Sequence, residues 1–352
     1  MTARDRDSCH YALLGPGRVG ELPRTQSALP TGWVRVRIAY CGVCGSDVSR
    51  WSGQRAAAYP VSLGHEWVGV VEALGPDVQA LTLGDVVTTD LNHRCGTCSS
   101  CTSGRSHLCR HGQEGRFSNR GFATIVDLDA TYLQRCWTAP APHLALAEPV
   151  SCVLHAVDHC RLTHDDRILV VGAGGLGLCT AFVLFNTAQV TGFDVVDRDR
   201  IRLARLAEVV APLGRAVDAP TEAYDVVLDM SGTVAGLQEA CQRLTPGGQL
   251  CTMSHLPDHA EVGLLERLGH KDATVTISYL NGPSTTLTRA IRLLERSWSP
   301  LWDTLLDVRP LDELPAVFEG RSTSPANKVV IDVDAAGARS AAQRLQALAQ
   351  VV

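Results

Sequence analysis

Four cysteines at the spacing CxxCxxCx7C form the pattern in this chain that most clearly predicts a chemical role. Two-residue gaps let a turn bring successive sulfurs to one ion, and Gly96 and Gly104 permit the tight backbone that this requires. Thiolates around Zn²⁺ then make a closed tetrahedral site with no open position. Free surface thiols and a nucleic-acid-binding zinc finger are weaker alternatives, because exposed thiols are reactive and no basic recognition helix follows. The sequence therefore predicts a structural zinc loop over residues 95–109, with the ligands Cys95, Cys98, Cys101 and Cys109.

A second group of possible ligands is mixed in type and lies in the segments AYCGVCGSD and GHEWVG. Cys44 offers a thiolate and His65 an imidazole. A catalytic zinc site needs one more protein ligand and keeps one position open for water or substrate. Glu66 adjoins His65, Glu148 in ALAEPVSCVLHA is the other candidate, and Cys152 is a weaker one. The third ligand stays open at this point.

Two side chains beside Cys44 have types that suit the same chemistry. Asp47 is placed to hydrogen-bond the far ring nitrogen of His65 and hold the imidazole toward a metal. Ser46 supplies a hydroxyl that can pass a proton. A lone cysteine more often fills a core, as we expect of Cys41. The mixed set upstream of a four-cysteine loop nevertheless favours a catalytic metal site.

The segment RILVVGAGGLGL predicts a dinucleotide-binding turn. Gly172, Gly174 and Gly177 follow a buried strand and open a helix, which is the context that makes GxGxxG informative. The turn also contains Gly175 and Leu176. Glycines there permit a tight turn and close approach of a pyrophosphate, whose charge the helix N-terminus favours.

An acidic residue near the end of the next strand indicates which cofactor binds. The strand QVTGFDVVD ends near Asp194, about 20 residues past the turn, where an acid accepts hydrogen bonds from the adenosine ribose. A carboxylate at this place repels a 2′-phosphate, so NAD is favoured over NADP. Arg198 and Arg200 lie close by and moderate that preference.

The surrounding patterns predict two kinds of domain. With 352 residues the chain has the length of about two domains. From about Val34 to Leu133, short β-branched runs are broken by turn residues, as in a strand-rich domain. From about Asp166 to Tyr279, apolar strands alternate with helical stretches, as in a parallel sheet covered on both faces. The late strand NKVVIDV is expected to return to the first domain.

Composition and charge argue against several classes of partner. The formal net charge is −5 and no basic run occurs, so neither nucleic acid nor an anionic membrane is an expected partner. No segment reaches the roughly 18 consecutive apolar residues of a membrane span. The N-terminus MTARDRDSCHYALL lacks the apolar region of a secretory signal. Thirteen cysteines without such a signal indicate a reducing compartment, and we expect a cytoplasmic protein.

Taken together, the motifs resemble those of zinc-dependent medium-chain dehydrogenases, the superfamily of alcohol and polyol dehydrogenases, over essentially the whole chain. The resemblance implies an α/β protein with a β-rich GroES-like catalytic domain and a Rossmann domain, which has a doubly wound parallel sheet. We expect the catalytic domain over 1–150, the NAD-binding domain over 151–281 and a return to the catalytic domain over 282–352. The motifs that carry the resemblance are CGVCGSD, GHEWVGVVEALGPDV, LGDVV, CGTCSSCTSGRSHLC, LAEPVSCVLHAV, VVGAGGLG and TPGGQL.

The resemblance also implies roles for single residues. Cys44 and His65 match catalytic zinc ligands, and Glu66 matches an acid that ligates or nearly ligates zinc. Glu148 stands where ordinary alcohol dehydrogenases have a cysteine ligand, which is similar to the sorbitol, threonine and cyclitol dehydrogenase branch. Ser46 matches the relay hydroxyl, and the loop 95–109 matches the structural-zinc loop.

Three features depart from the family pattern. Many relatives have a histidine shortly after the relay serine, and this chain has Ser49 and Arg50 there, so the exit of the proton relay is not assigned. The N-terminal strand matches poorly. GHEW, with Trp67, is similar to aminocyclitol dehydrogenases of antibiotic pathways.

The expected function is hydride transfer between NAD and a secondary alcohol or ketone, with a polyol, sugar-like or aminocyclitol substrate, and specialised metabolism is the expected setting. We expect two zinc ions per subunit, one catalytic and one structural, and a homodimer or homotetramer. One alternative is a zinc-dependent reductase of another carbonyl, an aldehyde or ketone, that uses NADPH. Others are a zinc-independent enone or quinone reductase, which would lack both ligand sets, and a non-catalytic binding protein of the same fold, which predicts broken ligand sets.

Overall fold

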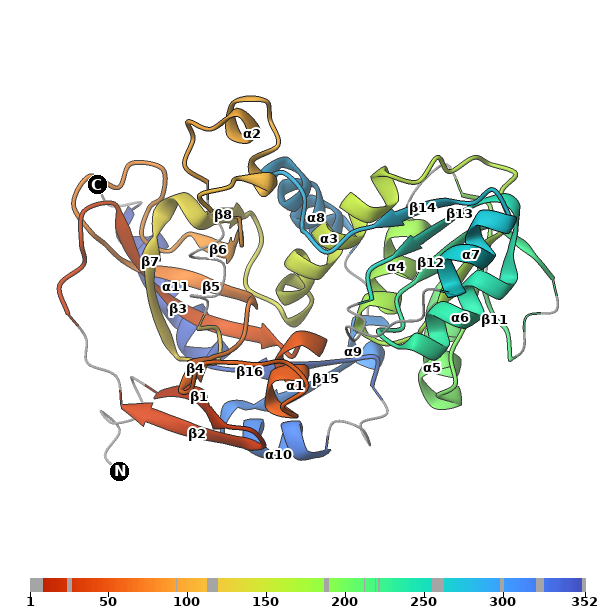
Figure 1. The fold of residues 1–352 in the computed structure, drawn as a ribbon. Helices are drawn as coiled ribbons and strands as arrows, with labels where there is room; N and C mark the ends of the chain where they lie inside the picture. The colour runs from red at the N-terminus through yellow and green to blue at the C-terminus, as the bar shows by residue number, and fades with distance from the viewer. Residues whose placement is uncertain are drawn as a thin grey trace.

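The computed structural model has two lobes, each built on its own large β-sheet (Figure 1). The lobe drawn mainly in red and orange also contains blue strands from the end of the chain, and the other lobe is drawn mainly in green and cyan. The residues that the structure describes are 9–23, 27–92, 94–112, 120–186, 190–211, 213–218, 220, 222–254, 263–297, 301–320 and 326–349.

The first lobe is built on a mixed sheet that brings distant parts of the chain together. Its strand order is β15-β16-β3-β5-β6-β8, and β7 also pairs with β3. β16 lies antiparallel to β3, so the predicted return of NKVVIDV to the first lobe is observed. The strands are β3 (Trp33–Gly42), β5 (Glu66–Leu74), β6 (Val86–Thr89), β7 (Ile125–Asp129), β8 (Leu133–Cys136), β15 (Leu306–Pro310) and β16 (Lys328–Asp332). A small sheet beside it contains β2 (Arg18–Pro23), β1 (Cys9–Gly15) and β4 (Val61–Ser62).

The second lobe has six parallel strands in the order β11-β10-β9-β12-β13-β14. In chain order this is 3-2-1-4-5-6, the arrangement of dinucleotide-binding Rossmann folds. The predicted parallel sheet is therefore confirmed. The strands are β9 (Ile168–Val171), β10 (Phe193–Val196), β11 (Gly214–Ala216), β12 (Tyr224–Asp229), β13 (Leu244–Thr252) and β14 (Thr274–Ile277).

The helices that pack on the sheets have apolar residues at helical spacing. In α8, Leu287, Ala290, Ile291 and Leu294 are buried at helical spacing, which gives the helix one continuous apolar face. The α-helices are α1 (Gly45–Trp51), α2 (Ser99–Thr102), α3 (Ala147–Asp158), α4 (Gly175–Phe185), α5 (Arg200–Val210), α6 (Val234–Arg243), α7 (Gly263–His270), α8 (Ser284–Arg296), α9 (Leu301–Leu305), α10 (Leu314–Gly320) and α11 (Ala335–Ala349). Short 3₁₀ turns are η2 (Ser106–Leu108), η4 (Ala130–Tyr132), η5 (Pro142–Leu146) and η6 (Leu311–Glu313).

The helix α3 joins the two lobes. It is buried along nearly its whole length and packs against α4 of the second lobe, against α8 and against β5 of the first lobe. A helix in that position can carry a side chain to the junction between the sheets. Its first turn contains Glu148, one of the predicted site residues.

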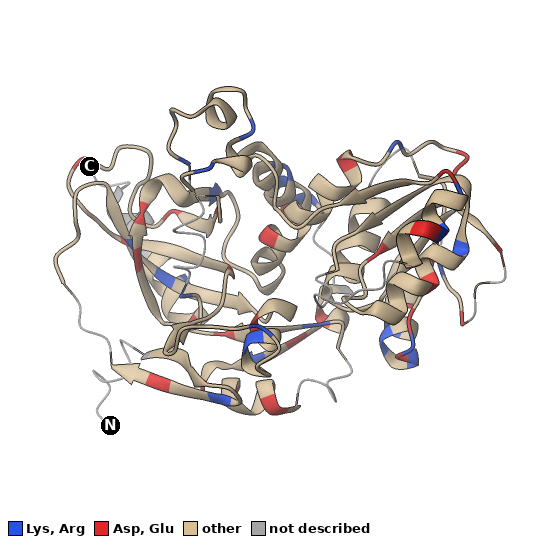
Figure 2. Ribbon diagram, in the orientation of Figure 1, with Lys and Arg blue, Asp and Glu red and all other residues tan. Residues whose placement is uncertain are grey.

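Charged residues of both signs are interspersed over the described elements (Figure 2). This distribution agrees with the absence of a basic run in the sequence. No helix in the described part of the chain combines the length and the apolar run that crossing a lipid bilayer requires.

Candidate active site

Cys44 is held in place by the start of α1. It is the N-cap of this helix, and its sulfur accepts a hydrogen bond from the Ser46 N–H at 3.5 Å. The Asp47 carboxylate accepts the Cys44 N–H at 3.1 Å, which completes a capping box. The predicted relay residue Ser46 thus lies half-buried in the first turn, directly beside the Cys44 sulfur.

Asp47 connects this helix to His65. Asp47 is only 1% exposed, and its Oδ1 lies 3.7 Å from His65 Nδ1 and accepts the Gly64 N–H at 3.5 Å. With Nδ1 facing a carboxylate, Nε2 is the ring nitrogen left for a metal. Burial acts to lower the pKa of His65, but the Cys44 and Asp47 groups together raise it well above its usual value. The local field therefore favours a positive charge at this position.

Glu66 and Lys328 form a buried ion pair next to His65. Glu66 begins β5, where it pairs with Gly42, and its side chain is almost completely buried. Lys328 begins β16 and reaches Glu66 Oε2, with a side chain only 5% exposed. The Lys328 side chain also lies against Gly175, since a Cβ there would stand 3.0 Å from Lys328 Cδ. One lysine thus spans the distance between the acid and the glycine-rich turn.

The ligand atoms of Cys44, His65 and Glu66 lie within 4.8 Å of one another. A thiolate, an imidazole and a carboxylate at this separation fit a zinc ion that keeps a fourth position open. Glu148 is described by the structure but is not part of this group. Burial raises its pKa, and the Cys152 thiol donates a hydrogen bond to its Oε1 at 3.3 Å.

The four loop cysteines also come together. Their sulfur atoms lie within 4.8 Å of one another, which fits the closed site expected for structural zinc. The backbone N–H groups of Cys98 and Cys95 donate to the sulfurs of Cys95 and Cys109 at 3.3 and 3.4 Å. Hydrogen bonds from Thr97 lower the pKa of Cys95 to about 5, which favours the thiolate form that binds metal.

The glycine-rich turn has the geometry that its motif predicts. Gly172 adopts a φ of +107°, which side chains other than glycine rarely take. A Cβ on Gly177 would stand 1.8 Å from the Gly172 carbonyl oxygen, so close helix packing requires glycine. Gly174 is the N-cap of α4 and a Cβ there would meet open space, which leaves room for a ligand. Gly175 and Leu176 form the first turn of α4.

Comparisons with known proteins agree with this geometry. Residues 30–141 match the family model of the alcohol dehydrogenase GroES-like domain. The chain is 32% identical to a sorbitol dehydrogenase of Halalkalibacterium halodurans over 66% of its own length and 69% of the relative. It is 33% identical to a D-altritol 5-dehydrogenase of Agrobacterium fabrum over 66% and 71%. The chain belongs to the zinc-dependent medium-chain dehydrogenases.

Solved structures show the same fold over almost the whole dehydrogenase. An Escherichia coli galactitol-1-phosphate dehydrogenase superimposes with a TM-score of 0.80 at 23% identity, covering 92% of this chain and 99% of the other. An alcohol dehydrogenase from Thermus sp. ATN1 gives a TM-score of 0.76 at 25% identity, with 92% and 99% coverage. The predicted fold class and the enzyme class, a zinc-dependent NAD(P) dehydrogenase acting on CH–OH groups, are confirmed.

The dehydrogenase does not bring Asp194 to the glycine-rich turn. Asp194 lies inside β10, where Arg215 binds its carboxylate with two hydrogen bonds of 2.8 and 2.9 Å and the Tyr224 hydroxyl donates a third. The acid that follows the end of β10 is Asp197. Its carboxylate accepts the backbone N–H of Ala173, inside the turn, at 2.5 Å. The predicted strand end near Asp194 lies two residues before the observed end at Val196.

The neighbouring arginines lie on the surface. Arg198 is exposed beside Asp197, and Arg200 is exposed and pairs with Asp218 at 3.1 Å. Arg50, which stands in place of a relay histidine, donates to the Ser46 carbonyl at 3.3 Å. The structure therefore gives neither Arg198 nor Arg200 a contact with the turn among the described interactions.

Sequence reasoning missed two contributors to this dehydrogenase site, Lys328 and Asp197. Lys328 belongs to a strand recognised only by its apolar pattern, and nothing local marks its side chain. Asp197 lies with Asp194 in the segment DVVDRD, and only the end of β10 at Val196 separates the two.

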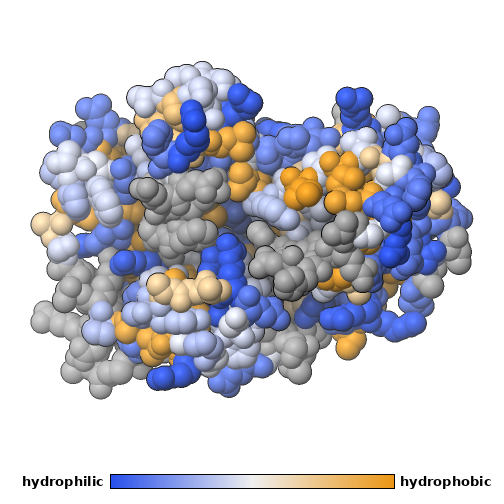
Figure 3. Space-filling model, viewed as in Figure 1, coloured by the Kyte–Doolittle hydropathy of each residue, from blue (hydrophilic) through white to orange (hydrophobic). Residues whose placement is uncertain are grey.

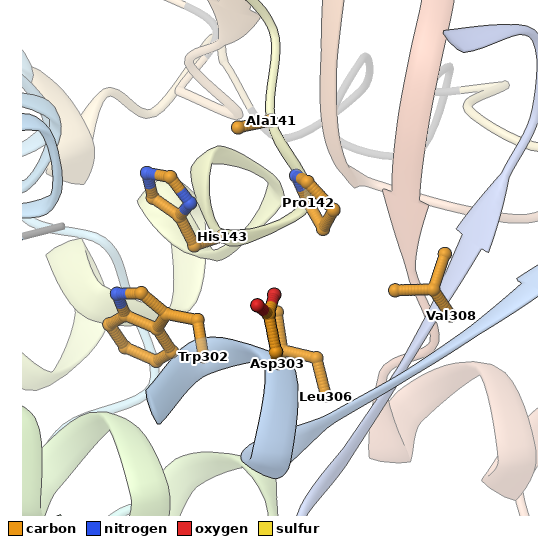
Figure 4. Close-up of a pocket in the computed structure, with 7 residues that line it drawn as sticks. All are labelled: Ala141, Pro142, His143, Trp302, Asp303, Leu306 and Val308. Atoms are coloured by element: carbon orange, nitrogen blue, oxygen red, sulfur yellow. The ribbon is translucent and has the colours of Figure 1, made fainter. Parts of the chain in front are cut away.

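A separate cavity of about 270 Å³ contains none of the predicted site residues (Figure 4). It lies beside the ring of His143, which is stacked on Trp302 with ring centroids 6.1 Å apart. Burial lowers the pKa of His143 to about 4, so the imidazole is neutral at physiological pH. The cavity is lined by Ala141, Pro142, His143, Trp302, Asp303, Leu306 and Val308.

Proposed function

We propose that this chain catalyses hydride transfer between NAD and a secondary alcohol or ketone at a zinc ion held by Cys44, His65 and Glu66. The observation that carries the proposal is the Lys328 side chain, which touches both Glu66 and the Gly175 turn. The lysine places the metal group and the dinucleotide turn within one side chain of each other, which supports a metal-bound substrate and a dinucleotide at one site.

Zinc would supply Lewis acidity, which lowers the pKa of a bound hydroxyl as it does that of water. Asp47 orients His65 through Nδ1, and Ser46 is placed to take up the hydroxyl proton. Glu148 lies next to the group and is proposed as a further ligand or as an acceptor for the substrate hydroxyl. Cys95, Cys98, Cys101 and Cys109 are proposed as ligands of the structural zinc.

We propose that Asp197, in place of Asp194, accepts hydrogen bonds from the adenosine ribose and favours NAD over NADP. Two observations support this role: Asp197 follows the carboxyl end of β10, and its carboxylate accepts the Ala173 N–H in the glycine-rich turn. Arg198 stays a secondary candidate for binding the cofactor, because it follows Asp197 directly and is exposed. Measuring KM for both cofactors tests this: Asp197→Ser is expected to raise KM for NAD without raising KM for NADP, and equal changes would contradict it.

The substrate is proposed to be a polyol, a sugar-like molecule or an aminocyclitol. Three observations support this class: the acid at position 148, the GHEW segment, and relatives named as sorbitol, D-altritol and L-threonine dehydrogenases. The test is NADH formation by the zinc-loaded protein across a panel of polyols, cyclitols and amino alcohols, with the ketones in reverse. Protein that holds no zinc, or that gives no NADH signal anywhere in the panel, would rule the proposal out.

A homodimer formed through β14 is proposed as the smallest assembly, and a tetramer would need a second contact. β14 is the last strand of its sheet; Val275 and Ile277 along it and Tyr279 just after it are exposed, Ile277 by 62%. Figure 3 shows hydrophobic side chains gathered where Figure 1 places this edge. Sedimentation of an Ile277→Lys variant should give a monomer, because an open apolar edge strand readily pairs with another chain.

We also propose that the domain limits are 1–150, 151–281 and 282–352. The pairing of β16 with β3 supports the return of the last segment to the first lobe, although α8 packs on α3 between the lobes. A cytoplasmic location is supported by the described cysteines, which form no disulfide and include two clusters suited to metal.

A further inference from the structure

A thiol lies one helical turn from Glu148 and contacts its carboxylate. Cys152 follows Glu148 by four residues in α3, so both side chains lie on the same face of the helix. Cys152 Sγ donates to Glu148 Oε1 at 3.3 Å, a normal length for a hydrogen bond that involves sulfur. The two side chains are 6% and 7% exposed, so water has little access to the contact.

This contact fixes one oxygen of the acid and leaves the other uncommitted among the described hydrogen bonds. Oε1 receives the Cys152 thiol, and the charges of His65 and Glu66 act on the Glu148 carboxyl, although Glu148 is not part of the group of Cys44, His65 and Glu66. Held this way, Oε2 is available to whatever occupies the open metal position. A carboxylate free to rotate would also be free to enter the metal group and compete with Glu66.

We propose that Cys152 is a positioning residue that keeps the Glu148 carboxylate beside the metal group, where it accepts a hydrogen bond from the substrate hydroxyl and does not bind the metal. This inference rests on the proposed function. It assigns the third ligand to Glu66 and gives a chemical reason for a cysteine at a site where valine would fill the same space.

Two substitutions separate hydrogen bonding from packing. Cys152→Ser keeps a donor and loses volume, whereas Cys152→Val keeps the volume and loses the donor. We expect Cys152→Val to lower kcat/KM about tenfold, as losing the partner of a metal-site group does, while the thermal midpoint stays near that of the parent. Cys152→Ser should keep most of the activity and unfold at a lower temperature. If Cys152→Val had both higher activity and higher stability than Cys152→Ser, packing alone would explain Cys152 and the proposal would fail.

A second comparison asks whether Cys152 acts through Glu148. In a Glu148→Ala background, Cys152→Val is expected to cause no further loss, because the group that it positions is already absent. Additive losses would overturn the proposal. Cys179→Val serves as the matched control, since Cys179 is also a buried cysteine, in α4, and it has no described hydrogen bond to Glu148.

The visible spectrum of cobalt-loaded protein gives a readout that does not depend on turnover. Cys152→Val should change the cobalt d–d bands relative to the parent, because the released carboxylate enters the coordination sphere, and Cys152→Ser should not. A decrease in the intensity of sulfur-to-cobalt charge transfer in both variants, relative to the parent, would show that Cys152 is itself a ligand, which contradicts the positioning role. Unchanged spectra in both would also reject it. Failure of the parent protein to reduce NAD would instead reject the proposed function.

Discussion

The two predicted metal groups differ in how the chain builds them. The four-cysteine group takes all its ligands from residues 95–109 and is largely open to solvent, with only Cys109 buried. The mixed group takes ligands from the N-cap of α1 and the start of β5, and its charged neighbours come from α3 and β16. The first is a local structure, whereas the second exists only when the two sheets and α3 are assembled.

The two groups also compensate charge differently. In the loop, backbone N–H groups of Cys95 and Cys98 point at sulfur atoms and provide partial positive charge. In the mixed group, charged side chains compensate one another: Asp47 faces His65, and Lys328 pairs with Glu66, where both side chains are almost closed to water. A buried charge is costly unless it is paired, so substitutions in the mixed group should have larger effects.

The largest expected effect is loss of activity in Cys44→Ser. Removing the thiolate ligand should lower kcat/KM by about 1,000-fold, because a bound Lewis acid supplies several kcal/mol of transition-state stabilisation. Zinc content should fall from two ions per chain to one, and the loop zinc should remain. Metal analysis of the purified variant checks this. A variant that still held two zinc ions would show that the mixed group is not a zinc site.

The next effect is loss of stability in Lys328→Met. In zinc-free protein, where no metal neutralises Glu66, this change leaves the carboxylate buried without its partner, and breaking a buried pair in this way costs about 3–5 kcal/mol. Urea unfolding at neutral pH measures the loss. Lys328→Arg, which keeps the charge, is the control and should lose much less. Equal losses in both variants would mean that side-chain shape, and not charge, stabilises the junction.

Cys98→Ser should show the reverse pattern from Cys44→Ser. The loop zinc should be lost and the catalytic zinc kept, so kcat/KM of the folded protein should change little. Stability should fall by about 3 kcal/mol when free zinc is about 100 times its dissociation constant, because binding to the folded state alone stabilises it by that amount. Thermal unfolding with and without added zinc measures this. A large drop in kcat/KM of fully folded Cys98→Ser would show that the catalytic group depends on the loop zinc.

The sequence was sufficient to predict the features that depend on neighbouring residues only. The cysteine loop, the glycine-rich turn and the order of strands and helices follow from spacing over a few residues, and the structure has all three. Pairing between distant segments was not predictable in detail. Lys328 reaches Glu66 only because β16 lies antiparallel to β3, and no pattern near residue 328 indicates that contact.

The different positions of Asp194 and Asp197 have a related cause. Both Asp194 and Asp197 are acids near the end of an apolar strand, and the motif spacing fits either. The structure separates them because Arg215, on the neighbouring strand β11, binds Asp194, whereas the Asp197 carboxylate reaches the turn. Strand register, which the sequence does not state, decides which acid reaches the glycine-rich turn.

The smallest expected effect concerns His143, a buried titratable group without a charged role in either metal group. Its side chain is 4% exposed and burial lowers its pKa from 6.5 to about 4, so the folded protein keeps it neutral. Below pH 6.5 the unfolded chain binds a proton that the folded chain does not. Stability should therefore fall by about 1 kcal/mol per pH unit between pH 6.5 and 4, and no further below that. Urea unfolding of the parent and of His143→Phe isolates this contribution as the difference in slope. Identical slopes would mean that His143 is hydrated and titrates normally, and that burial without a partner does not suppress charge in this part of the molecule.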